Sequence, residues 1–157
     1  MNSEQLFHDI QNNPVSVLIG KQSHALGAVA ELFHIAGLIL LLASILLMSL
    51  RLLGLGLRKQ SLPQLAAATS RLIWIGLAFL VVSGLILFLP AADLYYPNPV
   101  FWFKFKVFAV ALIVQITLYR KVTRLESPKP IVAKATAVTV LGLWFAVAFS
   151  GRFIGFF

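Results

Sequence analysis

Four ionisable side chains fall within or at the ends of long apolar stretches of the sequence, namely Glu31, His34, Lys104 and Arg152. A charged side chain costs on the order of 2.5–3.5 kcal/mol near the centre of a membrane-spanning helix, so such groups normally face other helices and pair. We expect Glu31 to pair with Arg152 or Lys104, and His34 lies one helical turn from Glu31 on the same face. These residue types suit a small polar pocket for an anionic head group, a quinone or the edge of a haem.

The same side chains also fit a purely structural role. A salt bridge among them would hold the helices in register, while Lys104 and Lys106 would extend their ammonium groups to the lipid head groups. Ionisable groups inside a span are functional by default, but these lie near an interface. The sequence therefore leaves both interpretations open.

The number and positions of the histidines show how this chain could ligate haem. The chain has three histidines, His8, His24 and His34, and haem iron in a membrane bundle commonly hangs between two of them. His24 and His34 are the candidate ligands, but they share one predicted helix and lie about 15 Å apart along its axis. One chain therefore offers a single axial ligand, or two only with the help of His8 or a second protomer.

The elements that must position these groups are four apolar segments. Of the 157 residues 60% are apolar and 11% charged, with a mean hydropathy of +0.93; a soluble domain carries about a quarter charged residues. A membrane-spanning helix needs roughly 20 mostly apolar residues, and four segments qualify: 26–50, 72–92, 101–119 and 131–151. Short proline-rich turns between them favour antiparallel packing. The sequence predicts an all-α protein, with an antiparallel four-helix transmembrane domain over residues 25–157.

Residues 1–24 precede this domain. Leu6, Phe7 and Ile10 share one face of a predicted helix, and Asn13 followed by Pro14 is typical of a helix start. We expect a short amphipathic helix at the membrane interface, followed by a kink before the first span. The alternative is a frayed polar tail.

Lysine and arginine are concentrated beside two of the predicted loops. The chain has 13 of them and a net charge of +8. Nine flank the first–second and third–fourth connections: Arg51, Arg58, Lys59, Arg71, Arg120, Lys121, Arg124, Lys129 and Lys134. By the positive-inside rule both loops are cytoplasmic and both termini lie outside. Because the basic excess reflects topology, we do not expect a nucleic-acid partner.

The helical rise places the polar groups at one depth. At 1.5 Å per residue, Glu31 and His34 lie roughly 6–12 Å below the outer interface, and Lys104 lies at a similar depth in the third span. Ser83 in the second span reaches the same level, and Arg152 closes the fourth span. All four helices therefore contribute to one polar layer in the outer leaflet.

Several other functions find little support in the sequence. Cysteine is absent, which excludes disulfides and thiolate metal sites, and no nucleophile elbow, phosphate-binding loop or close carboxylate pair occurs. We therefore expect a non-enzymatic protein. A small-solute or metal transporter would need polar groups through the full depth, and the few serines and threonines of the inner half are expected to bond to their own backbone. Aromatic residues near the span ends, including Tyr119, are predicted to form interfacial belts.

An ordered set of motifs covers most of the chain. It consists of Asn13-Pro14-Val15-Ser16, Glu31-Leu32-Phe33-His34-Ile35-Ala36-Gly37, Arg51-Leu52-Leu53-Gly54, Ser83-Gly84-Leu85-Ile86-Leu87-Phe88, Asn98-Pro99-Val100-Phe101 with Lys104, and Gly151-Arg152-Phe153-Ile154. This set resembles a family of small four-helix bacterial membrane proteins of unknown function. The resemblance implies a four-helix bundle without an established activity. Its architecture is distantly similar to membrane cytochromes b and the copper-resistance D membrane domain.

Relatives in that family often carry a further polar position late in the third span, where this chain reads Gln115-Ile116-Thr117-Leu118-Tyr119. If that position held a cofactor ligand, this chain lacks it, which weakens the haem hypothesis. We expect a bacterial inner-membrane protein that works as a homo-oligomer or as an accessory or electron-transfer subunit of a larger complex. The alternatives are a structural subunit and, third, a transporter.

Overall fold

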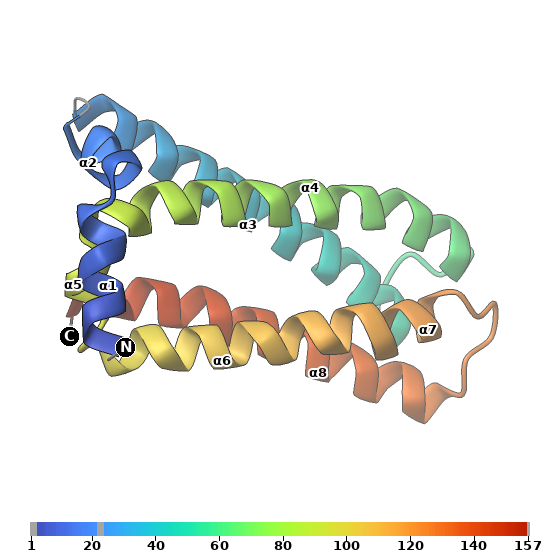
Figure 1. Cartoon of the computed structure of the whole chain (residues 1–157). Helices are drawn as coiled ribbons and strands as arrows, with labels where there is room; N and C mark the ends of the chain where they lie inside the picture. The colour runs from blue at the N-terminus through green and yellow to red at the C-terminus, as the bar shows by residue number, and fades with distance from the viewer. Residues whose placement is uncertain (1–2, 22–23, 157) are drawn as a thin grey trace.

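The computed structural model describes residues 3–21 and 24–156, and this part of the chain is helical with no strand. The helices are α1 (Ser3–Asn12), α2 (Pro14–Lys21), α3 (His24–Leu53), α4 (Leu62–Phe88), α5 (Ala92–Tyr95), α6 (Pro99–Val114), α7 (Arg120–Thr123) and α8 (Pro130–Phe153). A π-helical turn, Gln115–Tyr119, joins α6 to α7. The predicted all-α class is confirmed (Figure 1).

Four helical segments are long and apolar enough to cross a membrane, as predicted. They are Ala25–Leu53, Leu62–Tyr95, Pro99–Thr123 and Pro130–Phe156. The second begins ten residues earlier than the apolar stretch at 72–92. The Ser61 side chain caps the helix by accepting from the backbone N–H of Gln64, and the helix then continues past the charge of Arg71. Hydropathy therefore located the apolar part of this helix but not its true start.

The two ends of the bundle differ in what they carry (Figure 1). At one end, called here the terminal end, lie α1, α2, α5 and both chain termini. At the other, called here the basic end, lie the α3–α4 and α7–α8 connections with their lysines and arginines. Gly54 closes α3 at the basic end with a positive φ of 77°, and Leu55 N–H donates to the Leu50 carbonyl. This is the glycine-terminated helix end in which the last carbonyls find donors.

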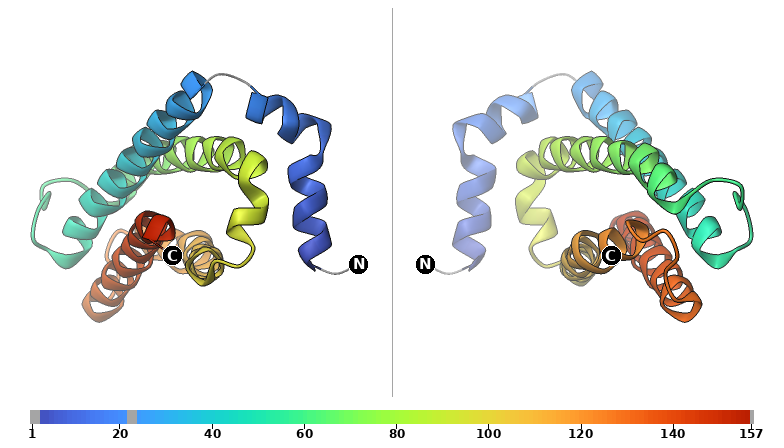
Figure 2. Two further views of the ribbon diagram at one scale, coloured as in Figure 1. Left: turned by 90° about the vertical axis from the view of Figure 1, so that its left-hand side faces the viewer. Right: turned by 90° about the vertical axis from the view of Figure 1, so that its right-hand side faces the viewer.

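The four spans do not pack as a symmetric bundle. α3 packs against α4, and α8 packs against both α3 and α6, whereas α4 meets the third span chiefly at α7. Figure 2, which looks along the bundle, shows α3 and α4 as one pair beside the α6–α8 pair. The side chains buried most completely between these helices include Leu41, Ile45, Met48, Val140 and Trp144. Consecutive spans were expected to be packing neighbours. The second and third contact each other at both ends, through α4 and α7 at the basic end and through the stacked rings of Phe88 and Phe101 at the terminal end.

α3 and α4 approach each other most closely at two glycines. A methyl group at Gly37 would lie 2.7 Å from the Gly76 carbonyl oxygen and 2.8 Å from Phe79 Cβ. A methyl group at Gly76 would lie 2.6 Å from the Gly37 carbonyl oxygen and 2.9 Å from Leu41 N. Small residues are what allow helix backbones to approach in lipid, where no hydrophobic effect drives helices together. These two glycines therefore set the α3–α4 contact.

α1 packs across the terminal end of the bundle, and it is not a frayed tail. Its Phe7 is buried among aromatic rings that include Phe88, Tyr96, Phe101 and Trp102. His8 pairs with Asp93 at 3.2 Å, and the Asp93 N–H donates to the Gln11 side chain at 2.8 Å. α2 begins at Pro14, where Asn13 accepts from the Val15 N–H, as the sequence predicts. The N-terminal region thus forms two helices before α3.

Replacing Gly76 with alanine is expected to lower the free energy of unfolding by about 1–3 kcal/mol, because the added methyl forces apart two backbones in contact. The matched control is Gly142→Ala, since a methyl at Gly142 meets nothing within 4 Å. That control should be neutral or stabilising by up to about 1 kcal/mol, because alanine favours a helix over glycine. Thermal unfolding in mild detergent measures both, and equal effects of the two variants would show that the crossing tolerates a side chain.

Candidate functional site

His34 projects from α3 onto α4 and is held there by a hydrogen-bond chain. Its Nδ1 lies 2.9 Å from the Ser83 hydroxyl, and the Ser83 hydroxyl donates to the Phe79 carbonyl one turn earlier in α4. A serine hydroxyl has a single hydrogen, so Ser83 accepts from the imidazole. Nδ1 therefore carries the ring proton. In the neutral ring this leaves a lone pair on Nε2. The backbone group recorded against the ring is the Leu80 carbonyl, an acceptor that cannot donate to this lone pair.

The imidazole fits where α4 lacks a side chain. A methyl group at Gly84 would lie 3.4 Å from His34 Cε1 and 3.7 Å from its Nδ1, so the ring rests against the bare backbone. The Leu80 carbonyl also faces the ring. Metal-binding and catalytic histidines are commonly fixed in this way, with one nitrogen donating to a protein oxygen and the other left for a ligand. The sequence predicts Ser83 at this depth but does not indicate its contact with His34.

Lys104 reaches the same layer from the third span. Its side chain is half-buried, and its ammonium lies against α8, 3.2 Å from the position that a methyl group at Gly151 would take. Lys104 is also near enough for its charge to act on the His34 ring. Groups from α3, α4, α6 and α8 therefore lie at one level near the terminal end, in two contacts: His34 with Ser83 and Gly84, and Lys104 with Gly151. Gly151 is the residue that sequence reasoning did not assign a role here.

The expected ion pair of Glu31 with Arg152 or Lys104 is wrong. The one ion pair among the described residues is His8–Asp93, and both Glu31 and Arg152 have exposed side chains. Glu31 still lies near enough for its charge to act on His34. The physical reason is depth: within two or three turns of an interface, long charged side chains can reach the head groups, so no pairing is enforced. The central members of the cluster are therefore His34 and Lys104.

The other two histidines, His8 and His24, matter as possible axial ligands of haem. Both ring nitrogens of His8 are engaged, Nδ1 with Asp93 and Nε2 with the Asn12 side chain at 3.2 Å. The side chain of His24 lies outside the residues that the structure describes. Among the histidines whose side chains the structure describes, His34 is the one that lies inside a span.

The inner half of the bundle carries polar groups that are mostly satisfied locally. Thr69, Thr117 and Thr136 each donate to the carbonyl four residues earlier, as expected for helical threonines. Gln115, at the start of the π-helical turn, accepts from the Trp144 indole at 3.3 Å. These interactions give no support to a continuous polar path.

Tyr119 does not belong to an interfacial belt, contrary to the sequence-based prediction. It is 4% exposed, and its hydroxyl lies beside Thr69 without a hydrogen bond of normal geometry. Its position near the end of the span suggested an interface. The direction of its side chain, which only the packing decides, turns it into the core.

One of three comparisons with known proteins gives a match. A family model described as a family of unknown function, DUF6644, matches residues 10–157. Neither the curated proteins nor the solved structures contain a significant match. The matched region includes all four spans and the residues of the polar layer. The chain therefore belongs to the DUF6644 family of unknown function, and its four apolar helices make it a multi-pass membrane protein.

Proposed function

We propose that this chain is a non-enzymatic membrane subunit that binds a small ligand with a polar head at the terminal end, through His34 and Lys104. Three ligand classes were open from the sequence: haem, a quinone and a lipid head group. Of these, a quinone in its reduced form, the hydroquinone, matches the two side chains best. Glu31 and Arg152 lie at the exposed margin of the site and would influence the approach of a charged group.

The observation that carries this proposal is the hydrogen-bond chain from Phe79 through Ser83 to His34. It presents Nε2 as an acceptor, and the ammonium of Lys104, which is a donor, lies near enough for its charge to act on the ring. A hydroquinone offers a hydroxyl to donate to Nε2 and an oxygen to accept from Lys104. A phosphate diester offers acceptors only, and would leave the Nε2 lone pair without a donor.

Haem fits these residues less completely. Nε2 of His34 is a suitable axial ligand, because its opposite nitrogen is anchored by Ser83. His8 is engaged with Asp93 and Asn12, and His24 shares α3 with His34, so a second ligand would have to come from another protomer. Haem thus requires an assembly that a quinone does not.

The wider setting is also a proposal. The concentration of lysine and arginine at the basic end supports a bacterial inner membrane with that end in the cytoplasm and the terminal end outside. α1 and α2 would then lie at the outer face of the inner membrane. The third span is the least buried of the four, which supports contact with a second copy or with a larger complex.

Two substitutions test the ligand site. His34→Ala and Lys104→Met are each expected to weaken binding of decylubiquinol at least tenfold, because each removes one polar contact to the ligand. The matched controls are His8→Ala, in α1, and Lys106→Met, two residues along α6 from Lys104 with an exposed side chain. Binding is measured as the dependence of the thermal unfolding midpoint on decylubiquinol concentration in mild detergent.

The outcomes separate the proposal from its alternatives. Binding that is unaffected by both site variants, or lost equally in the controls, contradicts the assignment. No binding by the unaltered protein, together with lower thermal stability of His34→Ala, would favour the structural subunit. Sharp bands in the dithionite-reduced absorption spectrum of protein from haem-replete cells would favour haem instead.

Ser83 tests the positioning of the imidazole. Ser83→Ala removes the acceptor of the Nδ1 proton and is expected to weaken decylubiquinol binding about fivefold, the value of one hydrogen bond of about 1 kcal/mol. Ser83→Thr keeps a hydroxyl and should restore most of the affinity. If the threonine variant binds as weakly as the alanine variant, the hydroxyl does not position His34.

A further inference from the structure

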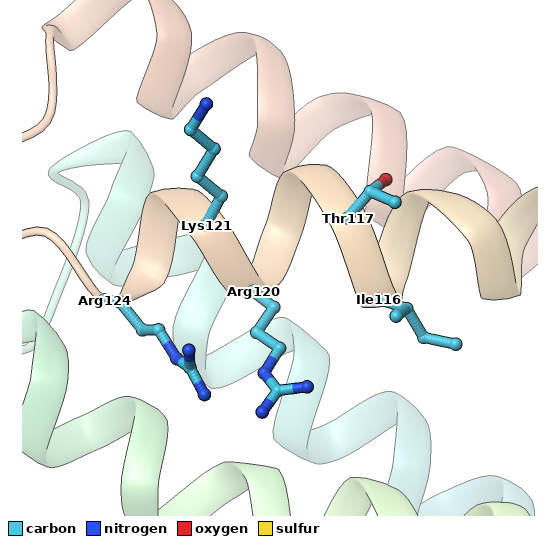
Figure 3. A pocket seen from close by; sticks show the side chains of 5 residues that line it. All are labelled: Ile116, Thr117, Arg120, Lys121 and Arg124. Carbon is cyan, nitrogen blue, oxygen red and sulfur yellow. The ribbon is translucent and has the colours of Figure 1, made fainter.

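A second candidate site lies at the basic end, on the outward face of the third span. A surface pocket of about 510 Å³ is lined by Ile116, Thr117, Arg120, Lys121 and Arg124. Figure 3 shows Ile116, Arg120 and Arg124 on one side of the helix, with Thr117 and Lys121 on the other. Residues four apart lie above one another on a helix, so the two guanidinium groups and the isoleucine form one stripe.

The basic side chains of this pocket form no hydrogen bond or ion pair with the described part of the protein. Arg51 and Arg58, at the same end, donate to the backbone carbonyls of Gln60 and Gly54 and so stabilise the α3–α4 connection. By contrast, the side chains of Arg120, Lys121 and Arg124 make no hydrogen bond or ion pair within the described ranges, 3–21 and 24–156. Three adjacent positive charges without a carboxylate partner favour the binding of an anion at this pocket.

The depth of the pocket distinguishes its ligand from a free anion. The third span ends at Thr123, so Arg120 and Arg124 lie where lipid head groups begin. Ile116 lies one to two turns deeper, roughly 6–12 Å along the helix, and is 47% exposed. An anionic phospholipid would place its phosphate between the guanidinium groups and its acyl chain against Ile116. A free phosphate would make no use of the apolar part.

We infer that the pocket formed by Ile116, Thr117, Arg120, Lys121 and Arg124 binds the head group of an anionic phospholipid. The arginine fork donates paired hydrogen bonds to phosphate oxygens, and Lys121 adds a further positive charge. Orientation in the membrane needs positive charge at this end but does not need it gathered in one pocket. The arrangement therefore serves recognition in addition to topology. This inference is independent of the His34 site, which lies at the opposite end.

The test uses the full chain in mild detergent with added dioleoyl phosphatidylglycerol. The lipid is expected to raise the thermal unfolding midpoint of the unaltered protein by several degrees, with half of the rise at a defined lipid concentration. The double variant Arg120→Gln, Arg124→Gln should need roughly 30-fold more lipid, since each basic side chain near an anionic head group contributes about fivefold in affinity. The matched control, Lys129→Gln with Lys134→Gln, removes the same charge from the same end and should respond as the unaltered protein does.

Two further additions separate the sources of the anion. Dioleoyl phosphatidylcholine, which has no net charge, and inorganic phosphate at the same concentration are each expected to leave the midpoint unchanged. An equal rise with phosphatidylcholine would overturn the inference in favour of general lipid solvation. An equal rise with inorganic phosphate would identify a free-anion site, and equal losses in the variant and its control would show a non-specific charge effect.

Discussion

The contact between Gly37 and Gly76 is the constraint on which the rest of this structure depends. It lets the backbones of α3 and α4 touch, with methyl positions at these residues lying 2.6–2.9 Å from atoms of the opposite helix. One turn along α3 from Gly37, towards the terminal end, the same close approach brings His34 against Ser83 and Gly84. If larger side chains separated the helices here, an imidazole could not reach the Ser83 hydroxyl. The polar layer thus exists because two residues lack side chains.

The two ends of the bundle differ in which charged side chains have partners within the protein. At the terminal end, His34 is anchored by a hydrogen bond to Ser83, and the Lys104 ammonium lies against Gly151 without an ion pair to any residue that the structure describes. At the basic end, Arg51 and Arg58 are engaged with backbone carbonyls, whereas Arg120 and Arg124 are left for a partner. Anchored groups define the geometry of a site, and unengaged groups of one sign attract a counter-charge. These contrasts separate structural cations from recognition sites more clearly than residue type does.

Glu31 makes no ion pair because an unpaired charge costs little at its depth. The cost of an unpaired charge is high at the bilayer centre and falls towards the interface, where water and head groups are in reach. Glu31 lies in the part of α3 where its side chain is exposed, so its charge needs no protein partner. His34, three residues on, is half-buried and takes a partner. One helical turn in depth and direction changes the outcome.

The sequence alone was enough to predict the positions of residues along the helix axes. Hydropathy located the four spans, the rise per residue placed Glu31, His34, Ser83 and Lys104 at one depth, and the lysines and arginines marked one end. The tertiary structure decided rotation and lateral distance. Only packing brings His34 into a hydrogen bond with Ser83 and turns Tyr119 into the core. Packing also sets the backbone contact between α4 and the third span, which lies chiefly at α7. Apolar residues surround these spans on nearly every side, so hydropathy carries little information on which face of a helix packs. That choice depends on the shapes of side chains at the contacts, above all on the two glycines where α3 and α4 cross.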